Sequence, residues 1–116
     1  MTKRNRPTAV MRAGLFAVAL CAALPAWAND AQLALGKSLF LKGATPPCAL
    51  CHTLQDAGSE GAIGPVLDEL KPDAERVANA LRNGVGSMPS FKDSLTAAQI
   101  EAIARYVAKA SRQPAK

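Results

Sequence analysis

Residues 48–52, which read Cys-Ala-Leu-Cys-His, constrain this chain more than any other segment. Two thiols three residues apart can each be joined to a vinyl group of one haem, and a histidine directly after the second thiol can become an axial ligand of the iron. The motif therefore predicts one covalently attached haem c with its iron. The rest of the chain is expected to pack around that group.

The first 28 residues have the pattern of a secretory signal peptide. Residues 1–12 carry four basic residues and no acid, and residues 13–24 are an apolar run. Residues 26–28 read Ala-Trp-Ala, with small residues at the two positions that a signal peptidase recognises. An apolar run of this length is short for a membrane span, which needs about 20 residues. We expect cleavage after Ala28, export to the periplasm and no stable membrane anchor. An uncleaved anchor and lipid attachment at Cys21 are the alternatives, although Leu20 is large for lipoprotein processing.

The cysteine motif has three other interpretations. A redox dithiol of the thioredoxin type is expected within a βαβ pattern, which is missing here. Structural zinc usually takes four ligands, and the predicted mature chain offers only Cys48, Cys51 and His52, so zinc would need carboxylates or a second chain. A disulfide would close a very short loop and leave His52 without a role. Haem attachment uses all three side chains.

The predicted mature chain, residues 29–116, is one domain with few large apolar side chains. Its 88 residues include three aromatic residues, one histidine and one methionine. A domain of this size is close to the limit at which an apolar core alone can stabilise a fold, so a buried porphyrin would supply part of the core. The ten basic and nine acidic residues that remain after cleavage give a net charge of +1. This composition gives no support for nucleic-acid binding.

Helical periodicity and capping residues predict three helices, and no alternation long enough for a sheet is present. The first helix begins after Asn29 or Asp30 and ends at Gly43, the second follows Pro72-Asp73 and ends at Asn83-Gly84, and the third opens with a capping box at Thr96-Ala97-Ala98-Gln99. A short helical turn is expected at residues 48–53. Residues 53–71, which contain three glycines and a proline, are predicted to form a loop over one haem face.

Two loop positions could complete an iron site. A ligating histidine needs an acceptor for its second ring nitrogen, and the carbonyl of Pro65, in the segment Gly64–Leu67, is the candidate; a plain turn is the alternative. Met88 is the one methionine of the predicted mature chain and lies in residues 83–91, a segment whose glycines and proline suit a loop laid over a flat ring. Lys92 or an open position are the alternatives for the sixth ligand.

The order of these motifs, ending in a terminal helix with Tyr106, resembles class I monohaem cytochromes c over nearly all of the predicted mature chain. The resemblance implies a small all-α fold whose N- and C-terminal helices cross, with Gly36 and Phe40 against Tyr106, around the covalent haem. It also implies that the cofactor-binding residues are Cys48, Cys51, His52, Pro65, Leu67 and Met88. Of these, His52 and Met88 would be the axial iron ligands.

More narrowly, residues 48–54, 67–73 and 84–91 are similar to those of the small cytochromes that accept electrons from bacterial sulfite dehydrogenases. This resemblance implies a one-electron carrier without enzyme activity, with a sulfite dehydrogenase as donor. A methionine ligand would raise the reduction potential, which suits a terminal oxidase as acceptor. A haem subunit of a larger redox complex, or a general respiratory carrier unrelated to sulfite, are the alternatives. Catalysis or gas binding at an open haem is disfavoured, because no second histidine could act as a distal acid or base.

Overall fold

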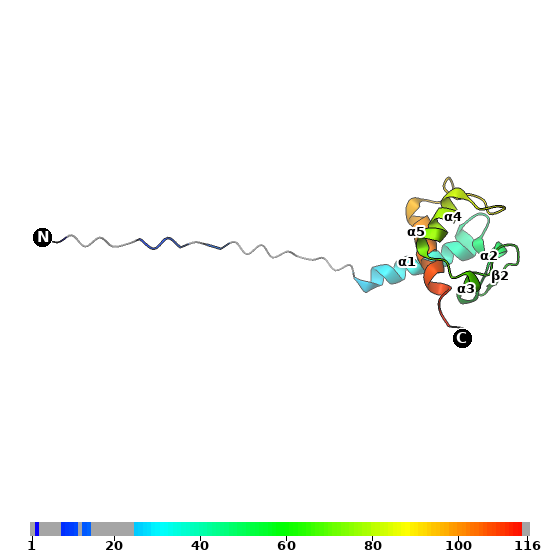
Figure 1. The fold of residues 1–116 in the computed structure, drawn as a ribbon, viewed down its shortest axis with the longest axis horizontal. Coiled ribbons are helices and arrows are strands. Elements are labelled where there is room, and N and C mark those ends of the chain that lie inside the picture. Colours follow the sequence, from blue (N-terminus) through cyan, green and yellow to red (C-terminus); the bar gives the residue numbers. More distant parts are fainter. Residues whose placement is uncertain (1, 3–7, 12, 15–24, 115–116) are drawn as a thin grey trace.

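The computed structural model of the protein describes residues 2, 8–11, 13–14 and 25–114. Three helices form its frame: α1 (Ala26–Ser38), α4 (Ala74–Asn83) and α5 (Ala97–Ala110) (Figure 1). The shorter elements are the π-helical turn η1 (Leu39–Gly43), α2 (Cys48–Cys51), the 3-10 turn η2 (Gln55–Ala57), α3 (Leu67–Leu70) and the strands β1 (Thr53–Leu54) and β2 (Ser59–Glu60). The small, mainly helical fold predicted from the sequence is confirmed.

Most of the predicted signal peptide, residues 1–28, lies outside the described residues, Cys21 included. Within the described part, α1 begins at Ala26, after an extended Pro25, and no side chain caps it. The expectation that Asn29 or Asp30 would cap this helix is therefore wrong for the full chain, because Ala26, Trp27 and Ala28 continue the helix up to the proline. Among the residues described, none of the helices has the length and apolarity needed to cross a bilayer.

Helices α1 and α5 cross at a glycine, as predicted. A Cβ atom added to Gly36 would lie 2.6 Å from the Cβ of Tyr106, so any side chain there would push the two helices apart. One turn later, the rings of Phe40 and Tyr106 meet edge to face, with their centroids 6.0 Å apart. The buried core continues from this crossing to the inner faces of α4 and α5, where Leu81, Ile103 and Val107 are almost fully enclosed.

The other two helix starts match their sequence signals. The side chain of Asp73 accepts a hydrogen bond from the Arg76 N–H at 2.8 Å, which satisfies one of the free donors in the first turn of α4. At the start of α5, Thr96 and Gln99 form the predicted capping box, each side chain accepting from the other residue's backbone N–H.

The segment predicted as a plain loop, residues 53–71, is more ordered than the sequence suggested. Strands β1 and β2 pair antiparallel, with Leu54 opposite Ser59, and the turn between them ends at Gly58, whose φ of 62° lies in the left-handed region. Helix α3 follows and ends at Lys71, also left-handed at φ 46°. Strands of two residues leave no alternation to detect, which is why the sequence pattern missed them.

Candidate haem-attachment site

The cysteine motif forms a single helical turn that begins at an extended proline. Pro47 has φ −62° and ψ 140°, its carbonyl accepts from the Leu50 N–H at 3.1 Å, and the Cys48 carbonyl accepts from the His52 N–H at 3.0 Å. Helix α2 is therefore the predicted short turn. Both cysteines are half-buried and unpaired, and His52 is the first extended residue after the turn.

The ring of His52 is held by the segment predicted to hold it. Its Nδ1 atom lies 2.9 Å from the carbonyl oxygen of Pro65. A carbonyl oxygen can only accept, so Nδ1 is the donor, and in the neutral tautomer with this bond the lone pair is on Nε2. A Cβ atom at Gly64 would lie 2.5 Å from Cε1 of the ring, so this close approach of the chain depends on glycine. The contact between Pro65 and His52 is thus present, and its role toward iron stays a prediction.

The Cys48 thiol is poorly suited to be the nucleophile of dithiol redox catalysis. Burial of the Cys48 thiol raises its pKa to about 11, and the nearby Cys51 adds a smaller effect in the same direction. A backbone hydrogen bond acts in the opposite direction. Catalytic dithiols instead have a lowered pKa, because the thiolate is the nucleophile. Within the described residues no group of three His, Cys, Asp or Glu side chains is placed to hold a metal ion, so the zinc interpretation has no ligand set there.

Met88 lies in a tight turn that fixes its main chain. Val85 and Met88 exchange two backbone hydrogen bonds of 3.0 and 2.9 Å, and the glycines on either side of Val85 have φ values of 71° and 55°. The turn is attached to α4, because the Phe91 N–H donates to the Leu81 carbonyl at 2.6 Å. The side chain of Met88 is half-buried against the core. This is the loop placement expected for Met88, whereas its ligation of iron stays a prediction.

Three exposed aliphatic side chains lie in the same segments as the predicted haem residues. Leu50 is 61% exposed, Ile63 is 73% exposed and Val85 is 64% exposed. They belong respectively to the cysteine turn, the segment before Pro65 and the Met88 turn. No role for them was predicted from the sequence, although a large aliphatic residue in a glycine-rich loop can indicate a contact with an apolar group. Leu67, by contrast, is buried at the start of α3, and its predicted haem contact is untested.

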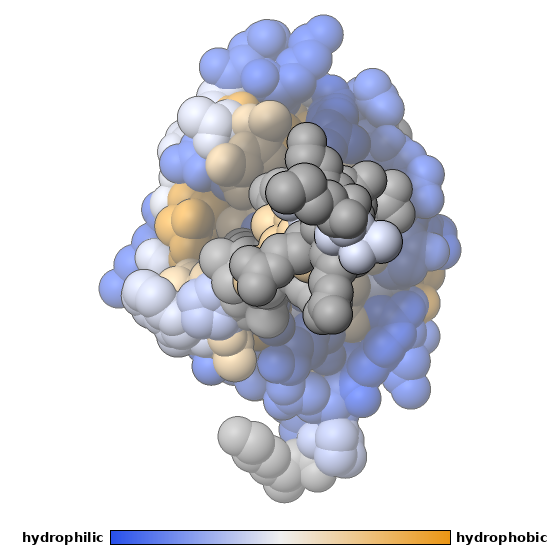
Figure 2. Space-filling model, turned by 90° about the vertical axis from the view of Figure 1, so that its left-hand side faces the viewer, coloured by the Kyte–Doolittle hydropathy of each residue, from blue (hydrophilic) through white to orange (hydrophobic). Residues whose placement is uncertain are grey.

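These observations agree with the chemistry of a covalent haem. The donor set consists of two free thiols, one imidazole with its Nε2 lone pair available, and one thioether. Leu50, Ile63 and Val85, which are exposed in the same segments, are side chains of the kind that can pack against a porphyrin. Most of the surface seen in Figure 2 is hydrophilic, with apolar residues gathered in restricted areas. The residues present therefore fit haem c.

Asp56 connects the segment after His52 to the helix crossing. Its carboxylate accepts from the Tyr106 hydroxyl at 2.8 Å and from Lys37 Nζ at 3.2 Å, and its carbonyl accepts from the same Lys37 at 2.8 Å. Burial and the bond to Asp56 raise the pKa of Tyr106 well above its usual range. Tyr106 therefore stays a neutral hydroxyl donor and helps to attach the hairpin to α1 and α5. Nothing in the sequence pattern indicated this link.

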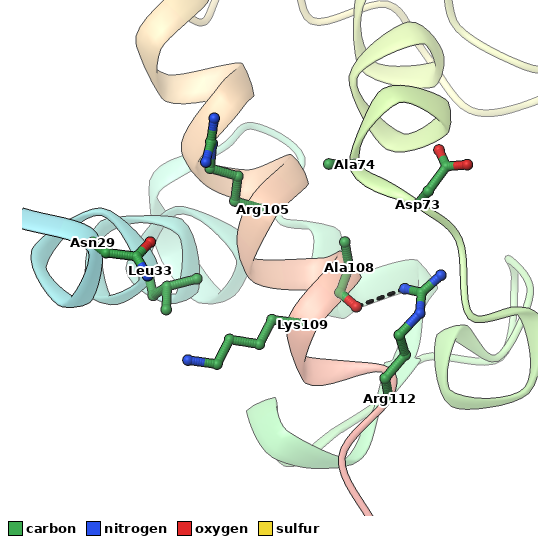
Figure 3. A pocket seen from close by; sticks show the side chains of 8 residues that line it. All are labelled: Asn29, Leu33, Asp73, Ala74, Arg105, Ala108, Lys109 and Arg112. Atoms are coloured by element: carbon green, nitrogen blue, oxygen red, sulfur yellow. Dashed lines mark hydrogen bonds between the residues drawn. The ribbon is translucent and has the colours of Figure 1, made fainter. Parts of the chain in front are cut away.

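A groove of about 400 Å³ lies between α1, α4 and α5, away from the predicted haem residues (Figure 3). Arg105, Lys109 and Arg112 from α5 and the residues after it supply its positive charges. The guanidinium of Arg112 donates to the carbonyls of Ala108, Lys71 and Pro72, which ties the end of α5 to the link between α3 and α4. None of the predicted haem residues lines this groove, so it is not the haem site.

Comparisons with known proteins agree with this assignment. Residues 31–107 match the family model described as cytochrome c oxidase, cbb3-type, subunit III. The chain is 37% identical over 91 residues to cytochrome c6 of Rippkaea orientalis (strain PCC 8801 / RF-1), covering 72% of this chain and 73% of that protein. It is 28% identical over 73 residues to cytochrome c-551 of Halorhodospira halochloris, covering 62% of this chain and 92% of that protein.

A solved structure is similar over the same region. The crystal structure of the c-type cytochrome SorU from Sinorhizobium meliloti matches with a TM-score of 0.69 and 54% sequence identity. The match covers 71% of this chain and 93% of the SorU chain. The shared part therefore extends over nearly all of that protein.

Proposed function

The chain belongs to the cytochrome c family, carrying one covalent haem c with its iron, and we propose that it is a periplasmic one-electron carrier with His52 and Met88 as axial ligands. The observation that carries the proposal is the arrangement of His52: its Nδ1 proton is held by Pro65, which leaves Nε2 available, directly after two free thiols. When bound, the haem supplies a couple of ferrous and ferric iron. No substrate chemistry is assigned to the protein.

Each predicted residue has a defined part in this function. Cys48 and Cys51 form the two covalent links, and the Pro65 carbonyl keeps the His52 ring in one tautomer and one orientation. A thioether ligand from Met88 favours ferrous iron and raises the reduction potential, which suits a carrier upstream of a terminal oxidase. Leu50, Ile63 and Val85 would exclude water from the haem. Residues 1–28 would direct export and be removed after Ala28.

The first test concerns attachment. Because thioether bonds to Cys48 and Cys51 survive denaturation, we expect haem to stay with the polypeptide on a denaturing gel and to resist extraction with acidified acetone. The pyridine derivative should have the spectrum of a c-type haem. Extraction of the haem from the wild-type chain would contradict the assignment, and Cys48→Ala, Cys51→Ala is the control that should show no retained haem.

The proposed electron donor is a periplasmic sulfite dehydrogenase. The proposal rests on the resemblance of residues 48–54, 67–73 and 84–91 to the cytochromes that serve such enzymes. SorU shares 54% of its residues with this chain in the matched region, so a partner of one is a reasonable trial partner of the other. Transient redox contacts are small, often below about 1,200 Å², and are accelerated by complementary charges around the contact. Lys42 precedes the cysteine motif and Lys92 follows Met88, and both are exposed and close enough in sequence to be such charges.

Reversing these two charges should slow the reaction with an acidic donor. We expect Lys42→Glu, Lys92→Glu to lower the bimolecular rate of haem reduction by sulfite dehydrogenase and sulfite roughly tenfold at low salt, within the range that steering provides. The difference should shrink as salt is added, because exposed charges are screened. Stopped-flow absorbance measures it, and Lys109→Glu, on the groove side of α5, is the matched control that should leave the rate unchanged.

If wild-type protein is reduced no faster than an unrelated cytochrome, the sulfite donor is excluded and a general respiratory carrier remains.

A haem subunit of a larger redox complex is the second candidate, favoured by the description of the matching family model as an oxidase subunit. The two are distinguished by native gel filtration of periplasmic and detergent extracts. A carrier elutes as a small haem protein, whereas a subunit elutes with its partners.

A further inference from the structure

We propose that Ser59 is a positioning residue for His52, and that it sets the orientation of this histidine toward the haem iron through the β1–β2 hairpin. The inference rests on the proposed ligation by His52. It concerns a residue seven positions along the chain, which belongs to neither the cysteine motif nor the Pro65 segment.

The hydroxyl of Ser59 makes two short bonds to the main chain around His52. It donates to the His52 carbonyl at 2.9 Å and accepts from the Leu54 N–H at 3.0 Å. The Leu54 carbonyl lies further away, at 3.4 Å. Since a hydroxyl has one proton, the shorter bond to His52 takes it. Ser59 is 7% exposed and Leu54 is fully buried, so water cannot readily replace these bonds.

The Ser59 hydroxyl bonds a carbonyl that has no hydrogen-bond partner within helix α2. His52 follows α2 with φ −113° and ψ 136°, so its carbonyl points out of the helix and needs another partner. The hairpin turn at Gly58 returns the chain so that Ser59 stands opposite Leu54 and reaches that carbonyl. His52 is thereby held at both ends, its main chain by Ser59 and its ring by the carbonyl of Pro65.

Gly61 adds close contact behind the same peptide. A Cβ atom there would lie 2.5 Å from the Cys51 carbonyl carbon and 2.6 Å from the His52 nitrogen, so the chain after β2 packs directly on the cysteine turn. The main chain of His52 therefore cannot move without moving the hairpin. Loss of the Ser59 hydroxyl would free the His52 carbonyl and allow the ring to tilt about its bond to Pro65.

The orientation of an axial imidazole can be measured in the oxidised holoprotein, because it sets the spread of the paramagnetically shifted haem-methyl resonances. We expect Ser59→Ala to change this spread and to shift the reduction potential. It should also accelerate hydrogen exchange of the Leu54 amide by about tenfold, as expected from the loss of one buried hydrogen bond. Ser59→Thr, which keeps the hydroxyl, should retain the native methyl pattern.

Two control variants separate positioning from general loosening. Thr53→Val removes the bond from the Thr53 hydroxyl to the Gly61 carbonyl, which belongs to the same hairpin, and it leaves both short Ser59 bonds to the main chain in place. Ser111→Ala removes a buried hydroxyl that has no hydrogen-bond partner within the described residues. Both should keep the native methyl pattern and potential. If Thr53→Val alters them as much as Ser59→Ala does, the effect belongs to the hairpin as a whole and the inference is wrong.

The inference is also overturned if Ser59→Ala exchanges faster at Leu54 and yet keeps the native pattern and potential. Should this variant not accumulate with haem, the pair Ser59→Thr and Ser59→Val, which differ by a hydroxyl in place of a methyl group, is compared in the same way. A native pattern in the threonine variant alone supports the inference, and equal patterns contradict it. Failure of the proposed function would appear separately, as wild-type protein without covalent haem or without ligation by His52.

Discussion

A chain with Cys48→Ala and Cys51→Ala is expected to lose the cooperative thermal transition of the holoprotein and most of its helical circular dichroism signal. The predicted mature domain has 88 residues, close to the size at which an apolar core alone contributes only about 3–5 kcal/mol. Its buried side chains come mainly from η1, α4 and α5 and from the segments next to them. The segments that carry Pro65 and Met88 leave Ile63 and Val85 exposed, so without haem they lack an apolar surface to pack against.

The effect must be separated from the substitutions themselves. Wild-type chain produced without haem attachment keeps both cysteines, and we expect it to resemble the double variant in both calorimetry and circular dichroism. A cooperative calorimetric transition with native-like helix signal in either haem-free protein would show that the protein core is sufficient alone. Partial helix signal without a transition would agree with the prediction, because α5 has a complete capping box and some local helix can persist.

The parts of the fold that the sequence predicted are those set by neighbouring residues. The start of α4 depends on Asp73 and the Arg76 N–H, and the start of α5 depends on Thr96 and Gln99. Each pair lies within one helical turn, so spacing alone identifies it. Gly36 and Tyr106 are 70 residues apart, and their contact was predicted only through the resemblance to a family. Composition and periodicity could not have placed one against the other.

The site divides in the same way. A ligating histidine requires an acceptor for its second ring nitrogen, and this requirement predicted the contact with Pro65. In the structure the Pro65 carbonyl oxygen lies 2.9 Å from Nδ1 of His52. Ser59 and Asp56 gave no comparable signal. A serine or an aspartate in a glycine-rich loop is usually a solvated turn residue. Their roles depend on a hairpin with strands of two residues, which brings Ser59 to the His52 carbonyl, and on a 3-10 turn, which brings Asp56 to Tyr106. Contacts of this kind produce no periodic pattern in the sequence, so the sequence could not predict them.

The start of α1 shows a different limit. Asn29 and Asp30 are good capping residues, and a helix beginning there was a sound expectation for the predicted mature chain. In the full chain the helix continues back to Ala26, because the three preceding residues tolerate helical geometry and Pro25 then ends it. A local cap is used only where the chain before it leaves the helix. If the predicted signal peptide is removed, the start of α1 in the shortened chain depends on the position of the cut.

Replacing Met88 by alanine should have the largest effect on the electronic properties of the protein. If the Met88 sulfur is the sixth ligand, the oxidised wild type should have a weak absorption band at about 695 nm, which the variant should lack. The reduction potential should fall by roughly 0.1 V or more, within the range of about 0.8 V over which axial ligands tune haem. Carbon monoxide or cyanide should then bind to the iron. These changes are measured by absorption spectroscopy and redox titration.

The turn around Met88 makes this substitution a clean test. Its main chain is held by two hydrogen bonds with Val85 and by the bond from Phe91 to Leu81, none of which needs the thioether. Alanine should therefore remove the ligand and leave the loop in place, so loss of the band reports ligation and not unfolding. Lys92→Ala is the matched control, because Lys92 is the alternative ligand four residues along the chain. If Lys92 were the sixth ligand, the oxidised wild type would lack this band, and Lys92→Ala, not Met88→Ala, would open the iron to carbon monoxide or cyanide. With Met88 as ligand only the first variant loses the band, since an alanine methyl group has no lone pair to offer the iron.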